Sequence, residues 1–208
     1  MNNKQIAFTG FLGVMLFAVA SLLGGFQFDD YNPMKQFISE TMAVGTPYGN
    51  MLRYFGYIPS GILLTVFSVS IIKTFPSNKS IKIGFLGVAL FYGVATVLVG
   101  IFPCDVGCNK EWINPSLSQL IHNLTGFLTY IFVPFSILLI GIGLQKHEKF
   151  ASLGRMAFLT GGSSFVFVMI LLSSPLSDYA GLFQRIIETL FIIWVVSCSK
   201  TLFTKTVS

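Results

Sequence analysis

The stretch IGFLGVALFYGVATVLVGIF, from Ile83 to Phe102, runs for 20 residues without a charged side chain. A helix needs about 20 mostly apolar residues to cross the hydrocarbon core of a bilayer. A spanning segment must also satisfy its backbone hydrogen bonds internally, which a helix does. This stretch therefore predicts a transmembrane helix.

Five further stretches have the same length and apolar character. Only 10% of the 208 residues are charged and 53% are hydrophobic, whereas soluble domains carry about 25% charged residues. No linker, charge run or repeat divides the sequence, so we expect one all-α domain over residues 1–208, a six-helix transmembrane bundle. The first stretch is expected to be a retained span and not a removed signal peptide. The five stretches run approximately over Ile6–Phe26, Leu52–Ile72, Leu120–Leu144, Leu153–Ser174 and Ile186–Phe203.

The positive charges predict the orientation of the bundle. Six spans place both termini on one side, and nine of the 13 lysines and arginines fall on that side. Since cytoplasmic loops are enriched in these residues, we expect both termini in the cytoplasm and the protein in the cell membrane. The lysine-bearing loops are short and lack interleaved aromatic residues, so no nucleic-acid partner is expected. The four basic residues on the outer side are Lys35, Arg53, Lys110 and Arg185.

The longest outer loop, residues 27–51, contains the segment MKQFISETMA. Its residues Phe37, Ile38 and Met42 recur at helical spacing, which predicts a short amphipathic helix lying at the membrane interface. Ser39 and Glu40 lie on this segment. They are either part of a functional outer surface or simply a solvated polar face.

Two cysteines follow the third span, and three interpretations of them compete. An outer loop of a bacterial-type membrane protein faces an oxidising space, which favours a disulfide between Cys104 and Cys108. A zinc site would need about four ligands, which Asp105 and His122 could complete. The third alternative is two free thiols. We expect the disulfide, and no metal site.

Asp105 lies just beyond the third span, where the C-terminus of a helix disfavours an anion. Its carboxylate therefore calls for a cationic partner or several hydrogen-bond donors. The candidate partners, each at the outer end of another predicted span, are His122, Arg53 and Arg185.

A polar stripe runs along the start of the fourth span. Ser118, His122, Thr125 and Thr129 share one helical face, and such a stripe usually faces the bundle interior or a wet cavity. The alternative for His122 is an interfacial histidine that is hydrogen-bonded to a loop carbonyl.

The start of the sixth span carries two opposite charges. Arg185 and Glu188 lie three residues apart and so share a helical face. They form either an interfacial ion pair, or a site in which the planar guanidinium of Arg185 holds an anion such as a carboxylate or a lipid phosphate.

These motifs together resemble a known family, domain-of-unknown-function 998, whose members are bacterial and archaeal six-helix membrane proteins. The resemblance covers nearly the whole chain and brings no established activity. The two cysteines are not part of the family pattern, which indicates a local covalent cross-link. The matching segments are YNPMKQFISE with Ser39-Glu40, GIFPCD with Asp105, His122, and GLFQR ending at Arg185.

The residues and the resemblance point to the same places, and they predict an outward-opening polar pocket lined by Glu40, Asp105, His122 and Arg185. One function is a membrane-embedded hydrolase or transferase acting on a lipid or another amphiphile. His122 would be its general base, oriented by Asp105 or Glu40, with Ser39 as a candidate nucleophile. The alternative is a non-enzymatic protein that binds a lipid or small molecule, or an accessory membrane subunit. Candidate ligand-binding residues are Arg185, Ser39, Arg53 and Glu188.

The predicted spans lack the residues that a redox or a transport function would need. No histidine lies in the middle of a span, so no heme or quinone cofactor is expected. No pair of spans broken by glycine or proline occurs in matching halves, as secondary transporters have.

Overall fold

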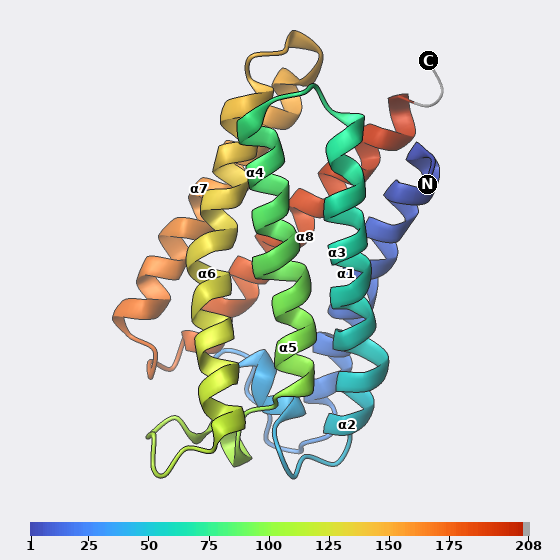
Figure 1. The fold of residues 1–208 in the computed structure, drawn as a ribbon. Helices are drawn as coiled ribbons and strands as arrows, with labels where there is room; N and C mark the ends of the chain where they lie inside the picture. The colour runs from blue at the N-terminus through green and yellow to red at the C-terminus, as the bar shows by residue number, and fades with distance from the viewer. Residues whose placement is uncertain (206–208) are drawn as a thin grey trace.

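The computed structural model describes residues 1–205, and within that range the chain is helical without a β-strand. Six helices are long and apolar enough to cross a membrane, which confirms the predicted six-helix bundle (Figure 1). They span Asn3–Gly25, Gly49–Thr74, Lys79–Ile101, Leu117–Leu144, Glu148–Ser173 and Ala180–Thr204.

Three of the six spans are built mainly of single α-helices, namely α1 (Asn3–Gly25), α6 (Leu117–Leu144) and α8 (Ala180–Lys205). The fifth is the short 3-10 turn η6 (Glu148–Phe150) followed by α7 (Ala151–Ser173). The other two are composite. The second runs through α2 (Gly49–Met51), η2 (Leu52–Tyr57), α3 (Ile58–Ser70) and η3 (Ile71–Thr74), and the third through α4 (Lys79–Val88), η4 (Ala89–Val94) and α5 (Ala95–Ile101).

The start of α1 and the end of α8 lie at the same end of the bundle, which we call the proximal end (Figure 1). The opposite, distal end carries the loops around residues 26–48, 102–116 and 174–179, and these include the 3-10 turns η1 (Ile38–Met42) and η5 (Val106–Asn109).

Every span begins a few residues earlier than the apolar pattern predicts. The reason is that a helix starts at its capping residue, which is polar, and not at its first apolar residue. The side chains of Asn2, Asn78 and Ser116 each accept a hydrogen bond from a backbone N–H of the first turn that follows.

The predicted amphipathic helix at residues 34–43 is wrong. The segment forms the 3-10 turn η1, and Ile38 and Met42 are buried in the bundle. Its backbone is held by two side chains, one distant and one local: Gln184 of α8 accepts from Ile38 N at 2.6 Å, and Glu40 of the turn itself accepts from Phe37 N at 2.7 Å. These bonds replace the ones that a regular helix would have supplied.

The second and third spans each contain a π-helical segment, η2 and η4. In η2 the wider turn precedes Pro59, which has no N–H and would otherwise crowd the carbonyl one turn earlier. The π segments contain Tyr57 and Tyr92, and both of these rings are almost completely buried in the distal half of the bundle.

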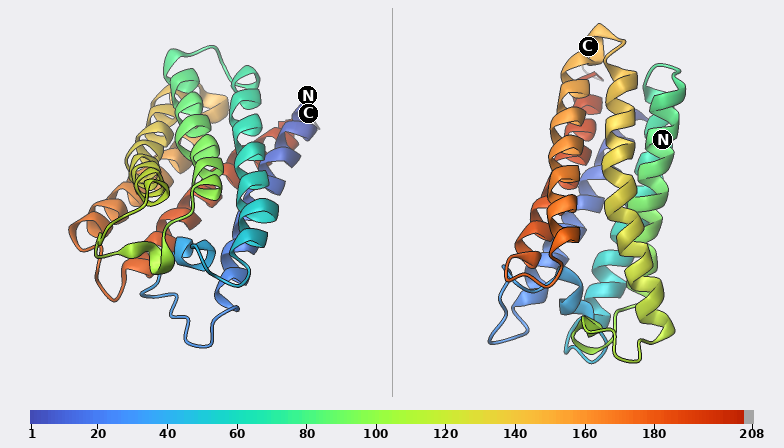
Figure 2. Two further views of the ribbon diagram at one scale, coloured as in Figure 1. Left: turned by 60° about the horizontal axis from the view of Figure 1, so that its bottom comes forward. Right: turned by 90° about the vertical axis from the view of Figure 1, so that its left-hand side faces the viewer.

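The helices α6 and α7 are close at the proximal end and separate toward the distal end (Figure 2). Small residues allow the proximal contact: a Cβ added to Gly141 would lie 3.0 Å from Ala157 Cβ, and one added to Gly161 would lie 3.1 Å from Pro134 O. The divergence leaves room between the two helices at the level of Phe127 and Leu172, both of which line a cavity.

Candidate functional site

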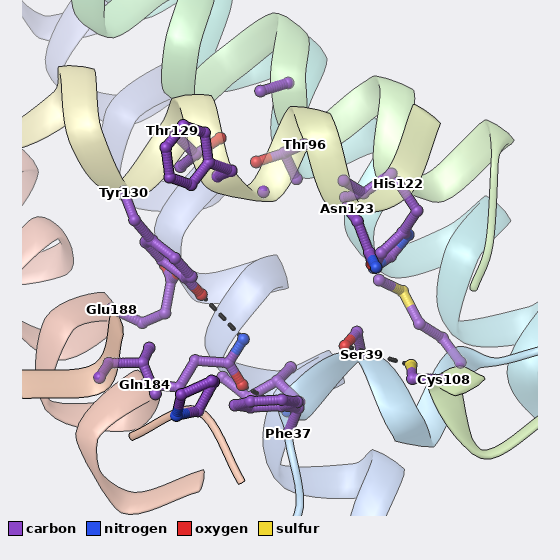
Figure 3. Close-up of a pocket in the computed structure, with 18 of the residues that line it drawn as sticks. Phe37, Ser39, Thr96, Cys108, His122, Asn123, Thr129, Tyr130, Gln184 and Glu188 are labelled. Atoms are coloured by element: carbon purple, nitrogen blue, oxygen red, sulfur yellow. Dashed lines mark hydrogen bonds between the residues drawn. The ribbon is translucent and has the colours of Figure 1, made fainter. Parts of the chain in front are cut away.

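A cavity of about 530 Å³ lies in the distal half of the bundle. Its volume falls in the range of roughly 300–1,000 Å³ that is typical of ligand pockets. Most of the lining side chains are apolar or aromatic, and the polar ones gather at two ends (Figure 3). Glu188, Gln184 and Tyr130 form the inner end, and His122, Asn123, Ser39 and Cys108 form the loop end.

The cavity reaches the surface between α6 and α7. Five of its lining residues are more than a third exposed, and all are apolar. Phe127 lies ten residues after the start of α6, about 15 Å along the helix axis. The opening therefore faces sideways, toward the side of the bundle that a bilayer would cover, as well as toward the loops. The exposed lining residues are Trp112, Phe127, Leu172, Pro175 and Leu176.

A directed chain of hydrogen bonds leads to Glu188 at the inner end. Ile38 N donates to Gln184 Oε1 at 2.6 Å, which fixes the orientation of the amide. Gln184 Nε2 then donates to the Tyr130 hydroxyl at 2.8 Å, and Tyr130 donates to Glu188 Oε1 at 3.1 Å. The chain thus starts at a backbone N–H and ends on the carboxylate of Glu188.

Two polar atoms at this inner end lack a partner. Glu188 Oε2 and the Tyr92 hydroxyl are buried and have no hydrogen bond within the described residues. Both residues line the cavity, and Glu188 is 7% exposed and Tyr92 1% exposed. Since buried polar groups are usually satisfied, this pair marks a place where a ligand could supply the missing bonds.

His122 and Ser39 line the loop end of the cavity. His122 Nδ1 lies 2.9 Å from Phe102 O, and because a carbonyl only accepts, Nδ1 carries the proton. Nε2 of the neutral ring is then the basic nitrogen. The Ser39 hydroxyl donates toward Cys108 Sγ at 3.4 Å. Three residues of the predicted stripe, His122, Thr125 and Thr129, are each less than a tenth exposed, while Ser118 is half-buried. The bond to Phe102 O is the loop-carbonyl contact that was the alternative for His122.

Glu40 is buried, but it forms an ion pair and does not line the cavity. Its Oε1 lies 2.7 Å from Lys110 Nζ and also accepts from Phe37 N at 2.7 Å. The Lys110 ammonium also lies over the Phe37 ring, 5.1 Å from its centroid. Glu40 thus joins η1 to the loop that follows the third span.

Asp105 is held by hydrogen-bond donors and not by a cation. Its carboxylate accepts from Ser116 N at 3.0 Å, from Ser116 Oγ at 2.5 Å and from Asn109 Nδ2 at 3.4 Å. The bond from the Ser116 backbone is the main reason that the pKa of Asp105 lies below its ordinary value. Because Ser116 caps α6, the positive N-terminal end of that helix provides the compensation that we expected from His122, Arg53 or Arg185.

Arg185 binds the distal loop that precedes η1. Its Nη1 lies 2.7 Å from both Pro33 O and Gln36 O, and Nη2 donates to the Tyr31 hydroxyl. No ion pair with Glu188 is present among the described residues, because Glu188 points to Tyr130 instead. Arg53, on the second span, donates to Asn50.

Of the seven candidate catalytic and ligand-binding residues, the structure brings three to the cavity and leaves four outside it. The three that line it are Ser39, His122 and Glu188. The four elsewhere in the described chain are Glu40, Asp105, Arg185 and Arg53.

A disulfide joins Cys104 to Cys108. The zinc alternative thereby loses two of its four proposed ligands. Residues 1–205 contain no group of three or more histidine, cysteine or acidic side chains placed to hold a metal ion. The disulfide packs against Ala43, and Cys104 O accepts from Val44 N at 2.9 Å, which connects the two longest distal loops.

Sequence reasoning missed three residues of the inner end: Tyr92, Tyr130 and Gln184. A signal was available for the tyrosines, since hydroxyl groups in the middle of apolar spans must find partners. The depth of Glu188 was also missed. Because α8 begins at Ala180, Glu188 lies eight residues inside the helix, about 12 Å from its start.

Six helices long and apolar enough to cross a membrane define a multi-pass membrane protein, and a ligand-sized cavity lies within the bundle. A family model described as "Protein of unknown function (DUF998)" matches residues 11–199. The chain therefore belongs to this family. Neither the curated proteins nor the solved structures contain a significant match.

Proposed function

We propose that this protein binds a lipid or another amphiphilic small molecule in the distal cavity, and that the molecule enters between α6 and α7. The observation that supports this proposal is the lateral opening, which is lined by exposed apolar residues and leads to a buried polar end. An apolar chain fits the opening and a polar head group fits the inner end. Most charged residues of the distal end are already engaged in contacts that hold the loops together, which favours binding over catalysis.

A substitution at Gly126 tests this proposal. Gly126 lines the cavity, and a Cβ added there meets no atom within 4 Å, so a larger side chain fills the cavity without a clash at its base. We expect Gly126→Phe to weaken binding of dodecanol by about tenfold or more, because the space for the chain is lost. Calorimetric titration of dodecanol into the purified protein in a bilayer nanodisc measures the affinity.

The matched control is Gly162→Phe. Gly162 lies in α7, has the same free space around an added Cβ, and does not line the cavity. Dodecanol should bind to this variant as to the parent protein. Equal heats for all three proteins would mean that dodecanol only partitions into the bilayer, and the proposal would fail.

A hydrolase or transferase is the second candidate, and one observation favours it. The basic nitrogen of His122 and the hydroxyl of Ser39 belong to the same cavity. In this function His122 is the general base for attack on an ester of the bound amphiphile. Incubation with dodecyl acetate separates the two functions, because only an enzyme releases acetate. If His122 is the base, His122→Gln abolishes this release.

We also propose that both termini lie in the cytoplasm and that the protein resides in the cell membrane. The distribution of lysine and arginine supports this orientation. The start of α1 and the end of α8 lie at one end of the bundle, as six spans require. The cavity then opens toward the outer leaflet.

Reporter fusions test the orientation. A reporter placed after Lys79 should be active in the cytoplasm, and one placed after Lys110 should be active outside, because one span separates the two positions. Activity assays of a paired cytoplasmic and periplasmic reporter give the readout. The reverse pattern would invert the proposed orientation.

A further inference from the structure

The carboxylate of Glu188 is buried without a cation. Within the described residues, the basic side chains nearest in the fold are engaged elsewhere: Lys110 with Glu40, Lys35 with Asp178, and Arg185 with backbone carbonyls. Removing a carboxylate from water without a partner is costly, and proteins usually pair such a group or neutralise it. The chain therefore leaves two ways to neutralise Glu188, which are a proton taken up by its own carboxylate or a cation carried by a bound molecule.

The hydrogen bonds around Glu188 define what such a bound molecule must carry. Because Tyr130 accepts from Gln184, its own proton is committed to Glu188 Oε1. Oε2 forms no hydrogen bond among the described residues, and the Tyr92 hydroxyl beside it can donate its one proton there, so lone pairs on both oxygens remain as acceptors. Two adjacent acceptors are matched by a group that carries several N–H or O–H donors.

Aromatic rings surround this end of the cavity. Phe17 packs against Tyr92 with ring centroids 6.1 Å apart and against Tyr57 at 5.4 Å, and all three line the cavity. Tyr130 adds a fourth ring. The faces of aromatic rings attract ammonium groups, and this attraction strengthens when water is excluded.

We infer that the inner end of the cavity is a binding site for a cationic ammonium head group, with Glu188 as its counter-ion. This inference rests on the proposed function and names its ligand class: a single-chain or lipid-like amine. The ammonium donates to Glu188 Oε2 and to the Tyr92 oxygen. The alkyl chain extends past Phe127 and Leu172 to the lateral opening.

Three amphiphiles that differ only in the head group test the inference: dodecylamine, dodecanol and dodecanoate. A charge-assisted bond to a buried carboxylate predicts that dodecylamine binds about 10- to 100-fold more tightly than dodecanol, and that dodecanoate binds most weakly. Glu188→Gln keeps an oxygen that can accept from Tyr130 but removes the charge. We expect this variant to lose the preference for the amine and to retain dodecanol.

The control for charge is Glu111→Gln. Glu111 is an exposed acid in the loop beside the opening, and its removal changes the net charge by the same amount. The preference for dodecylamine should persist in this variant. If all three probes bind but show no preference, or if Glu111→Gln abolishes it, the ammonium site is refuted while the cavity remains a binding site. If none of the probes binds, the proposed function fails with it.

Discussion

Replacing Arg185 with Met is expected to lower the free energy of unfolding by about 2–4 kcal/mol. Arg185 is half-buried and connects α8 to two carbonyls of the distal loop that precedes η1, Pro33 O and Gln36 O. Met preserves the apolar stem but leaves these carbonyls without their charged donor. Thermal unfolding followed by circular dichroism should show a fall of roughly 10 °C in the midpoint.

Arg53→Met is the matched control, since Arg53 lies at the same end of the bundle and bonds only to Asn50 among the described side chains. Its midpoint should move little. Arg185→Lys should give an intermediate loss, because an ammonium lacks the planar fork that reaches several acceptors at once. If Arg185→Met melts with the parent protein, the contact between α8 and the loop does not contribute to stability.

Replacing Gly61 with Leu is expected to be as damaging, by about 3–5 kcal/mol. An added Cβ at Gly61 would lie 2.6 Å from Gly93 O and 2.8 Å from Val97 N, both on the neighbouring span. These are backbone atoms, so the two helices must move apart. Small residues that permit such close approach are common where membrane helices pack.

Gly162→Leu provides the comparison, because an added Cβ there meets no atom within 4 Å. Leucine favours helix over glycine, so this variant should be unchanged or slightly more stable. The proportion of monodisperse protein after heating, measured by size exclusion, separates the two variants. A Gly61→Leu protein that survives like Gly162→Leu would contradict the close contact.

The six spans could be predicted from the sequence because one physical requirement, about 20 apolar residues, decides each of them. The 3-10 turn at residues 38–42 could not, since its hydrogen bonds come from Gln184, far away in the sequence. The same holds for the π segments. Pro59 explains the one in η2 after the fact, but its amino-acid pattern is that of an ordinary apolar helix.

The candidate site was predicted only in part for a related reason. Local spacing placed His122 on an inward face, and the structure agrees. The charges of Asp105 and Arg185 suggested a shared pocket, yet each is satisfied by nearby backbone groups: Ser116 N for the acid, and carbonyls of the loop at residues 33–36 for the base. Which partner a charge selects depends on tertiary contacts that spacing does not encode.

The packed aromatic rings of the proximal half determine where a molecule can leave the cavity. Phe85 stacks on both Phe75 and Trp194, and Phe150 meets Phe75 edge-on. The core on the proximal side of the cavity is therefore filled with aromatic side chains. A molecule that enters the cavity must therefore leave it at the distal end, between α6 and α7 or past the distal loops. If the proposed function is correct, such a blind-ended chamber exchanges with one side of a bilayer alone, and its occupancy reports the composition of that side without carrying anything across.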